Sequence, residues 1–166
     1  MSISFFIIQG IGAVAWLFLL ISYYCKNTNK ILLMQICSTI FFLIHYYLLD
    51  AYSGVLICLF EVFRDYLYYK TDKDRLIFWL LIPIQFIIGI FNFHYISDLF
   101  PILSSLIDGY TLTFKKEIVL IGAIISYLLW IIYDLSVGSY VGLIADGILI
   151  LSNIGILLYK KKNLDN

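Results

Sequence analysis

The chain has few charged residues and no net charge. Of its 166 residues 13% are charged and 63% are hydrophobic, and the 11 basic side chains are balanced by 11 acidic ones. A soluble domain usually carries about 25% charged residues, and one of this length still exposes roughly a third of its chain's surface. The composition therefore predicts a single membrane domain that has lipid as its solvent, and the lack of a basic excess excludes a nucleic-acid partner.

The sequence also lacks the motifs of an enzyme or of a metal centre. It has three cysteines, Cys25, Cys37 and Cys58, and two histidines, without the CxxC or Cys/His spacing of a metal or redox site. It has no Ser–Lys or Ser–His arrangement and no nucleotide-binding loop. We expect no catalytic residue, no metal and no cofactor, and we expect the protein not to be an enzyme.

Seven stretches resemble membrane spans, each of which needs about 20 mostly apolar residues. They cover residues 5–23, 31–49, 52–69, 76–93, 97–114, 118–135 and 139–159. The third is less apolar because it contains Glu61, Arg64 and Asp65, and the fifth because it contains Pro101 and Asp108. The sequence predicts an all-α membrane protein with seven transmembrane helices.

The distribution of charge over the loops supports seven spans. The loops after spans one, three, five and seven hold Lys26, Lys30, Lys70, Lys73, Arg75, Lys115, Lys116, Lys160, Lys161 and Lys162. The opposite loops hold no lysine or arginine, but they hold Asp50, His94, Asp98 and Asp134. By the positive-inside rule the N-terminus is outside and the C-terminus is cytoplasmic.

The chain contains a weak internal repeat with an offset of 88 residues. This offset aligns Tyr52-Ser53-Gly54 with Tyr140-Val141-Gly142, and the first three spans with the last three. We expect a three-helix repeat at 1–70, a linker helix at 71–95 and a second three-helix repeat at 96–166. Three is odd, so the linker gives both repeats the same orientation, and they are parallel about an axis along the membrane normal.

Several short motifs resemble a known family. They are Gln9-Gly10-Ile11-Gly12, residues 45–52, Arg64, Leu99-Phe100-Pro101, Trp130, Val137-Gly138-Ser139, Asp146-Gly147 and Asn153. The chain resembles the YgjV-type bacterial inner membrane proteins, a branch of the SWEET and PQ-loop grouping. The resemblance implies a SWEET-like fold in the bacterial inner membrane and says little about the substrate. The Pro-Gln dipeptide that names the PQ-loop proteins is absent.

Polar groups within the predicted spans are the candidates for a binding site, because an ionisable group in a bilayer needs a partner or a watery cavity. The predicted solute site consists of Glu61, Asp108, Asp146, Asn153, Trp16 and Trp130. These residues would bind a polar or cationic solute, or take up a proton, near the midplane between the repeats. A structural role for Asp108, and helix packing for both tryptophans, are the alternatives.

Two further residues are candidates for gating or proton sensing. His45 is near the outer end of the second span, and its alternative role is to bond a neighbouring carbonyl. Arg64 lies three residues after Glu61, so the two side chains share a helix face and an ion pair between them is the alternative to cavity roles. Asp65 is expected near the cytoplasmic interface.

These patterns favour a transporter, either a facilitator or coupled to protons, for a small polar solute such as a sugar, nucleoside or vitamin-like molecule. The substrate classes come from analogy with related folds. A membrane-embedded sensor or scaffold is the alternative, and it predicts a core closed to water. The expected partners are the solute, the lipid bilayer and a second copy of the chain in a homo-oligomer.

Overall fold

The structure is a computed structural model that describes residues 3–25, 27–71, 75–91 and 93–164. Lys26 and Lys73 of the predicted basic loops lie outside the described residues, as do the side chains of Lys116, Lys161 and Lys162. The elements in chain order are α1 (Ile3–Tyr24), α2 (Thr28–Leu48), α3 (Tyr52–Thr71), α4 (Arg75–Phe91), the 3-10 turn η1 (Ile96–Asp98), α5 (Leu99–Thr111), α6 (Lys116–Val137) and α7 (Tyr140–Leu164). The described part of the chain is thus all-helical with seven α-helices, as predicted.

Four of these helices are long and apolar enough to cross a membrane. Their spans are Ser4–Ser22 in α1, Asn29–Leu48 in α2, Glu117–Val137 in α6 and Tyr140–Lys160 in α7. The helix α4 is apolar but has 17 residues, and α5 has 13, which gives a length of about 20 Å. The helix α3 has 20 residues, three of them ionisable in its middle. The seven predicted spans therefore correspond to seven helices of unequal length and polarity.

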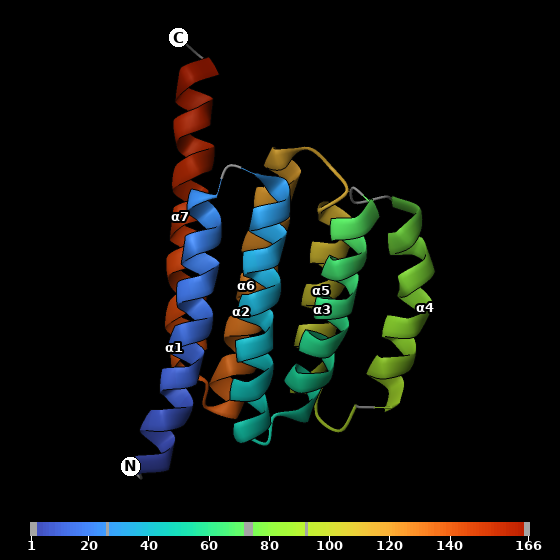
Figure 1. Ribbon diagram of the computed structural model, residues 1–166, viewed down its shortest axis with the longest axis vertical. Coiled ribbons are helices and arrows are strands. Elements are labelled where there is room, and N and C mark those ends of the chain that lie inside the picture. Colours follow the sequence, from blue (N-terminus) through green and yellow to red (C-terminus); the bar gives the residue numbers. More distant parts are fainter. Residues whose placement is uncertain (1–2, 26, 72–74, 92, 165–166) are drawn as a thin grey trace.

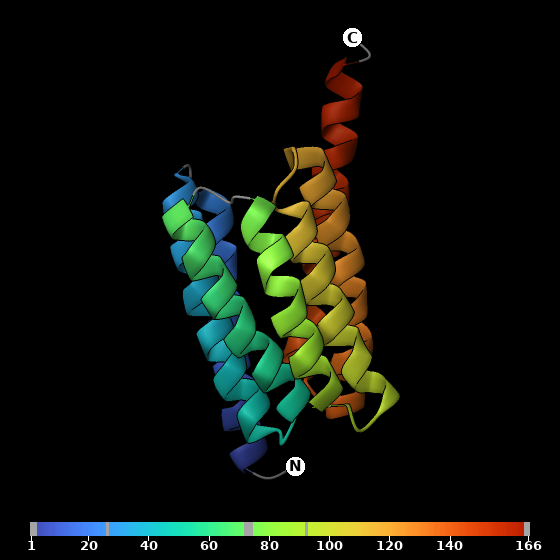
Figure 2. The ribbon, with the colours of Figure 1, turned by 90° about the vertical axis from the view of Figure 1, so that its right-hand side faces the viewer.

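The helices form two groups, each of which is an antiparallel series of neighbours (Figure 1). In the first group α1 packs on α2 and α2 on α3; in the second α5 packs on α6 and α6 on α7. The groups meet along two seams, where α1 contacts α7 and α3 contacts α5. The remaining helix, α4, lies outside the α3–α5 seam and contacts both helices (Figure 2).

The loops at each end of the bundle are closed by short local devices. Asn27 caps α2 by accepting a hydrogen bond from the backbone N–H of Asn29 at 2.8 Å. Gly138 ends α6 with a φ of 75°, a left-handed conformation that glycine adopts without steric cost. Asp50, with a φ of 57°, makes the turn between α2 and α3. Tight turns of this kind keep consecutive helices side by side.

The two ends of the bundle differ in charge. Lys30, Lys70, Arg75, Lys115 and Lys160 all lie at the end where α1, α3 and α5 finish and where α7 projects beyond its neighbours (Figure 1). We call this the basic end. The alternation of helices that the sequence predicted therefore brings the described basic residues of the loops to one end.

The outward faces of the helices are apolar. Large side chains such as Phe6, Leu80, Ile90 and Phe91 are more than half exposed. A water-soluble protein rarely leaves contiguous apolar surface of this extent uncovered, so lipid is its natural solvent. The buried cluster of Tyr46, Ile57, Cys58, Ile102, Ala51, Trp130 and Tyr133 lies instead between the two groups, toward the end opposite the basic end.

Candidate functional site

A cavity of about 610 Å³ lies between the two groups of helices. Residues of α1, α2, α3, α5, α6 and α7 line it, and α4 contributes none. Binding pockets for small molecules typically have volumes of about 300–1,000 Å³. The cavity is therefore large enough for a small solute, and it is enclosed by the two three-helix groups alone.

The cavity extends from the basic end to the middle of the bundle and beyond. At the basic end its lining includes Cys25 and Phe114, which stand in the loops after α1 and α5. At its other limit the lining includes Tyr46, Asp134 and Gly142, close to the opposite ends of α2, α6 and α7. The cavity is thus reached from the basic end.

The wall of the cavity is rich in polar groups. The polar lining residues are Ser22, Gln35, Ser38, Thr39, Tyr46, Glu61, Arg64, Asp65, Asp108, Thr111, Tyr127, Asp134, Asp146 and Asn153. Five of them are carboxylic acids and one is a guanidinium. Within a membrane protein, ionisable residues that face an internal cavity mark a solute or ion pathway.

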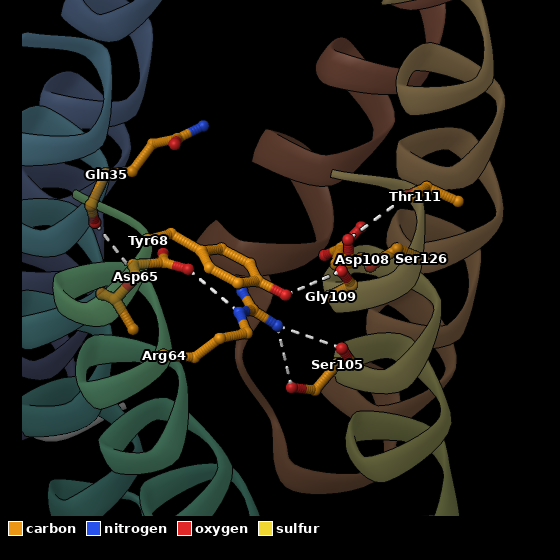
Figure 3. A network of polar contacts seen from close by, with 10 residues as sticks. Gln35, Arg64, Asp65, Tyr68, Ser105, Asp108, Gly109, Thr111 and Ser126 are labelled. Atoms are coloured by element: carbon orange, nitrogen blue, oxygen red, sulfur yellow. Dashed lines mark hydrogen bonds and ion pairs between the residues drawn. The ribbon is translucent and has the colours of Figure 1, made fainter. Parts of the chain in front are cut away.

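The single basic group of the wall, Arg64 on α3, is held in a network that joins α3 to α5 (Figure 3). Its Nε donates to Asp65 Oδ1 at 3.0 Å, and the same atoms form an ion pair. Its Nη1 donates to the carbonyl of Ser105 at 3.0 Å and to the hydroxyl of Ser105 at 3.2 Å. The adjacent Tyr68 hydroxyl donates to the carbonyl of Gly109 at 3.1 Å. The structure thus pairs Arg64 with Asp65, not with Glu61.

The predicted solute-site acids all reach the cavity, but they differ in their partners. Asp108 accepts a hydrogen bond from the Ser126 hydroxyl at 2.7 Å, which ties α5 to α6. Glu61 is 9% exposed, and its buried Oε1 has no hydrogen-bond partner. The Asp146 side chain, 8% exposed, makes no hydrogen bond to any residue that the structure describes. Asn153, 1% exposed, also lines the cavity.

Aromatic side chains close the cavity at the end opposite the basic end. The rings of Tyr46 and Trp130 are stacked, with centroids 5.4 Å apart, and both rings contact Tyr133 edge-on. Tyr46 donates its hydroxyl to Asp134 Oδ1 at 2.7 Å. Tyr133 donates to the carbonyl of Ala51 at 3.2 Å and accepts from the Gly54 N–H at 2.8 Å. We call Tyr46, Trp130, Tyr133 and Asp134 the closing layer.

Two glycines let this layer form. A Cβ at Gly54 would lie within 3.1 Å of the Tyr46 and Tyr133 rings. A Cβ at Gly142 would collide with the Asp134 carboxylate and the Ser139 hydroxyl. Glycine is needed at both positions because aromatic and carboxylate groups approach the backbone closely.

Hydrogen bonds beside the closing layer join the two groups at both seams. At the α1–α7 seam, Gln9 donates to the carbonyl of Gly138 and accepts from the Val141 N–H, both at 3.0 Å. At the other seam, Ser53 donates to Asp98 at 2.5 Å. Asp98 also accepts from the backbone N–H groups of residues 94 and 95 at 2.9 and 2.7 Å.

Two predicted site residues lie outside the cavity lining. His45 is fully buried; its Nδ1 is 2.8 Å from the carbonyl of Ile8 and its Nε2 is 3.0 Å from the Ser139 hydroxyl. It therefore links α2 to α1 and to the start of α7, beside the closing layer. Trp16 on α1 is partly buried, and its indole N–H has no acceptor among the described residues. Trp130, in contrast, lines the cavity.

Sequence reasoning missed three lining residues. Asp65 was expected near the interface but is 5% exposed and faces the cavity. Asp134 was assigned to an outer loop, but α6 continues to Val137 and the side chain is 1% exposed. Tyr46 was not singled out. The 88-residue offset contained the signal, because it aligns Tyr46 with Asp134 and Asp65 with the predicted Asn153.

Comparison with known proteins relates the chain to a family and to no individual protein. Neither the curated proteins nor the solved structures give a match. The family model Imp-YgjV, described as bacterial inner membrane protein, matches residues 6–163, which is nearly the whole chain. This agrees with the apolar helices and with the resemblance seen in the sequence. The chain belongs to the YgjV family of bacterial inner membrane proteins.

Proposed function

We propose that the protein is a transporter of a small polar solute, either a facilitator or coupled to protons. The observation that carries this proposal is the cavity of about 610 Å³, which is polar, reached from the basic end and closed at the other end by hydrogen-bonded aromatic rings. A passage that is open at one side and closed at the other is one of the two states that alternating access requires. No other described feature needs such a cavity.

The proposal includes a repeat architecture of three helices, a linker and three helices, with seven spans in total. Contacts across the molecule support it by joining positions related by the repeat offset. Tyr46 and Asp134, which are bonded to each other, are 88 residues apart. His45 contacts Ser139, and the counterparts of these two residues, Tyr133 and Ala51, are also bonded. Such an exchange of partners is expected from a twofold axis between parallel repeats.

The cavity lining supports the same axis. Many lining residues form pairs that are 88 positions apart: Ile31 and Val119, Gln35 and Ala123, Thr39 and Tyr127, Phe42 and Trp130, Tyr46 and Asp134, Cys58 and Asp146, Asp65 and Asn153. The cavity therefore surrounds the proposed axis, where transporters with parallel repeats bind their solute. The proposed relation to SWEET-like folds rests on this architecture.

In the proposed cycle one group of helices rocks against the other. The positive-inside rule assigns the basic end to the cytoplasm, so the present conformation faces inward. Opening to the outside requires the closing layer and the two seams beside it to separate, while the helices at the basic end approach one another. The hydrogen bonds of Tyr46, Tyr133 and His45 are the ones that this movement would break.

The alternative, a membrane-embedded sensor or scaffold, predicts a closed core with Asp146 held by hydroxyl groups. The open cavity and the absence of a hydrogen bond from Asp146 to the described residues favour the transporter.

Water access from both sides tests the proposal. Thr39 lines the cavity, and its neighbour Ile40 is exposed on the outer face of α2 at the same depth. In a variant without native cysteines, we expect Thr39→Cys to react with a membrane-impermeant methanethiosulfonate in inside-out vesicles. During cycling it should also react, more slowly, in right-side-out vesicles. Ile40→Cys, which faces lipid, is the matched control and should react poorly in both.

Two results would contradict the transporter. Equal, slow reaction of Thr39→Cys and Ile40→Cys would mean that no watery cavity exists. Reaction of Thr39→Cys from the basic side alone would mean that the closing layer does not open, as expected of a sensor or scaffold.

A further inference from the structure

The charges of the cavity wall do not balance. Arg64 is neutralised by Asp65, with which it forms an ion pair at 3.0 Å. Of the four other carboxyl groups in the lining, Asp108 and Asp134 each accept a hydrogen bond from a hydroxyl group. Glu61 and Asp146 remain, and no lysine or second arginine lines the cavity.

Glu61 and Asp146 stand out because each is about nine-tenths buried and lacks expected partners. Glu61 Oε1 is buried without any hydrogen bond, and Asp146 makes none to the described residues. Buried polar groups in proteins are nearly always hydrogen-bonded, and exceptions call for an explanation. A carboxylate at mid-depth in a membrane is also costly without a counter-charge. Both carboxyl groups line one cavity, so a cation within it would supply the missing partner.

The geometry indicates the kind of cation. Among the described residues no three His, Cys, Asp or Glu side chains are grouped closely enough to hold a metal ion. Calcium and magnesium ions need about six oxygen ligands at 2.0–2.6 Å, whereas these acids are spread around a cavity of about 610 Å³. An organic cation has the size to fill this space and to reach acids on different helices.

Aromatic rings complete the site. Phe42, Tyr46 and Trp130 line the same cavity as the acids. Aromatic side chains attract organic cations electrostatically and pack against their apolar parts. Carboxylates combined with aromatic rings are the surroundings that suit an alkyl- or arylammonium group, and they suit an anion or an uncharged sugar less well.

We propose that the cavity binds a small organic monocation, a protonated amine or a quaternary ammonium, with Glu61 on α3 and Asp146 on α7 as its counter-charges. The site draws one acid from each group of helices. A bound cation therefore joins the two groups and responds to their relative movement. The inference names the substrate class for the proposed transporter, and it rests on that function for its role but not for its binding.

Binding of matched probes to the purified protein in detergent tests the proposal. Benzylammonium and benzyl alcohol have similar size and shape, but the former carries a positive charge at neutral pH. By isothermal titration calorimetry at constant ionic strength, we expect benzylammonium to bind about tenfold more tightly or better, as one charge-assisted hydrogen bond would give. Equal affinities for the two probes, or no binding of benzylammonium, would overturn the proposal.

Variants locate the site. Asp146→Asn and Glu61→Gln should each weaken benzylammonium binding about tenfold and leave benzyl alcohol unchanged. The matched control is Asp50→Asn, which removes the same charge from an exposed turn outside the cavity and keeps a side chain that tolerates its positive φ. Unchanged binding in both cavity variants, with each eluting as a folded protein in size-exclusion chromatography, would also overturn the proposal.

This experiment fails independently of the proposed function. Two-sided reaction of Thr39→Cys together with no preference for benzylammonium would retain the transporter and reject the cation. Tight, Asp146-dependent binding with one-sided reaction would retain the cation site and turn the protein into a sensor of such cations.

Discussion

The closing layer and the cavity consist of similar residues in opposite situations. In the closing layer and the adjoining seams, the phenol, imidazole and amide groups of Tyr46, Tyr133, His45 and Gln9 all have hydrogen-bond partners. In the cavity, Glu61 and Asp146 have buried carboxyl groups with partners missing. Matched polar groups hold the two helix groups together, and unmatched ones leave binding energy available for a ligand. Substitutions in the two regions should therefore have different consequences.

The largest effect should come from making a matched cavity group unmatched. Arg64→Met leaves the Asp65 carboxylate buried without its ion-pair partner. Removing one partner of a buried pair typically destabilises a protein by about 3–5 kcal/mol. We expect a loss of this order in SDS-driven unfolding from mixed micelles.

The double variant Arg64→Met/Asp65→Asn is its control, because it removes both charges. It should recover much of the lost stability. A single variant as stable as the double variant would show that the Asp65 charge is already well solvated in the cavity, and that unmatched charge there carries no cost.

A smaller loss is expected when the closing layer is crowded. In Gly142→Ala the new Cβ would collide with the Asp134 carboxylate, which is fixed by Tyr46. Overpacking of this kind typically costs about 1–3 kcal/mol, and thermal unfolding in detergent measures it. Gly147→Ala, less than two turns further along α7, is the matched control because a Cβ there meets nothing within 4 Å. Equal stability of the two variants would mean that the layer gives way easily.

Composition and loop charge predicted most of the fold. Apolar runs located all seven helices, since helices in lipid must be built from such runs. The errors were at helix ends: the fifth element is split into η1 and a shorter α5, and α6 extends far enough to include Asp134. Local sequence did not show these boundaries, because the contact of Asp134 with Tyr46 on another helix decides where that acid lies.

The candidate site was predicted in its composition but not in its pairing. Hydropathy alone identified Glu61, Asp108, Asp146 and Asn153 as polar groups within apolar spans, and all four line the cavity. The partner of Arg64 was not predictable from spacing along α3. Its guanidinium reaches Asp65, the next residue, and Ser105 on a different helix. Tertiary packing, which a single sequence does not reveal, chose between the two acids.

The smallest effect on stability should come from Asp146→Asn. Because Asp146 has no hydrogen bond to the described residues, neutralising it removes a costly charge and breaks no contact. We expect the free energy of unfolding to stay the same or to rise by up to about 1 kcal/mol, as is common when a functional residue is replaced. Asp98→Asn is the matched control: Asp98 accepts hydrogen bonds from Ser53 and from two backbone N–H groups. An amide nitrogen in place of one oxygen would face a donor, so this variant should lose about 1–3 kcal/mol. Equal losses in the two variants would mean that Asp146 stabilises the fold as Asp98 does, and the distinction between a matched seam and an unmatched cavity would then disappear.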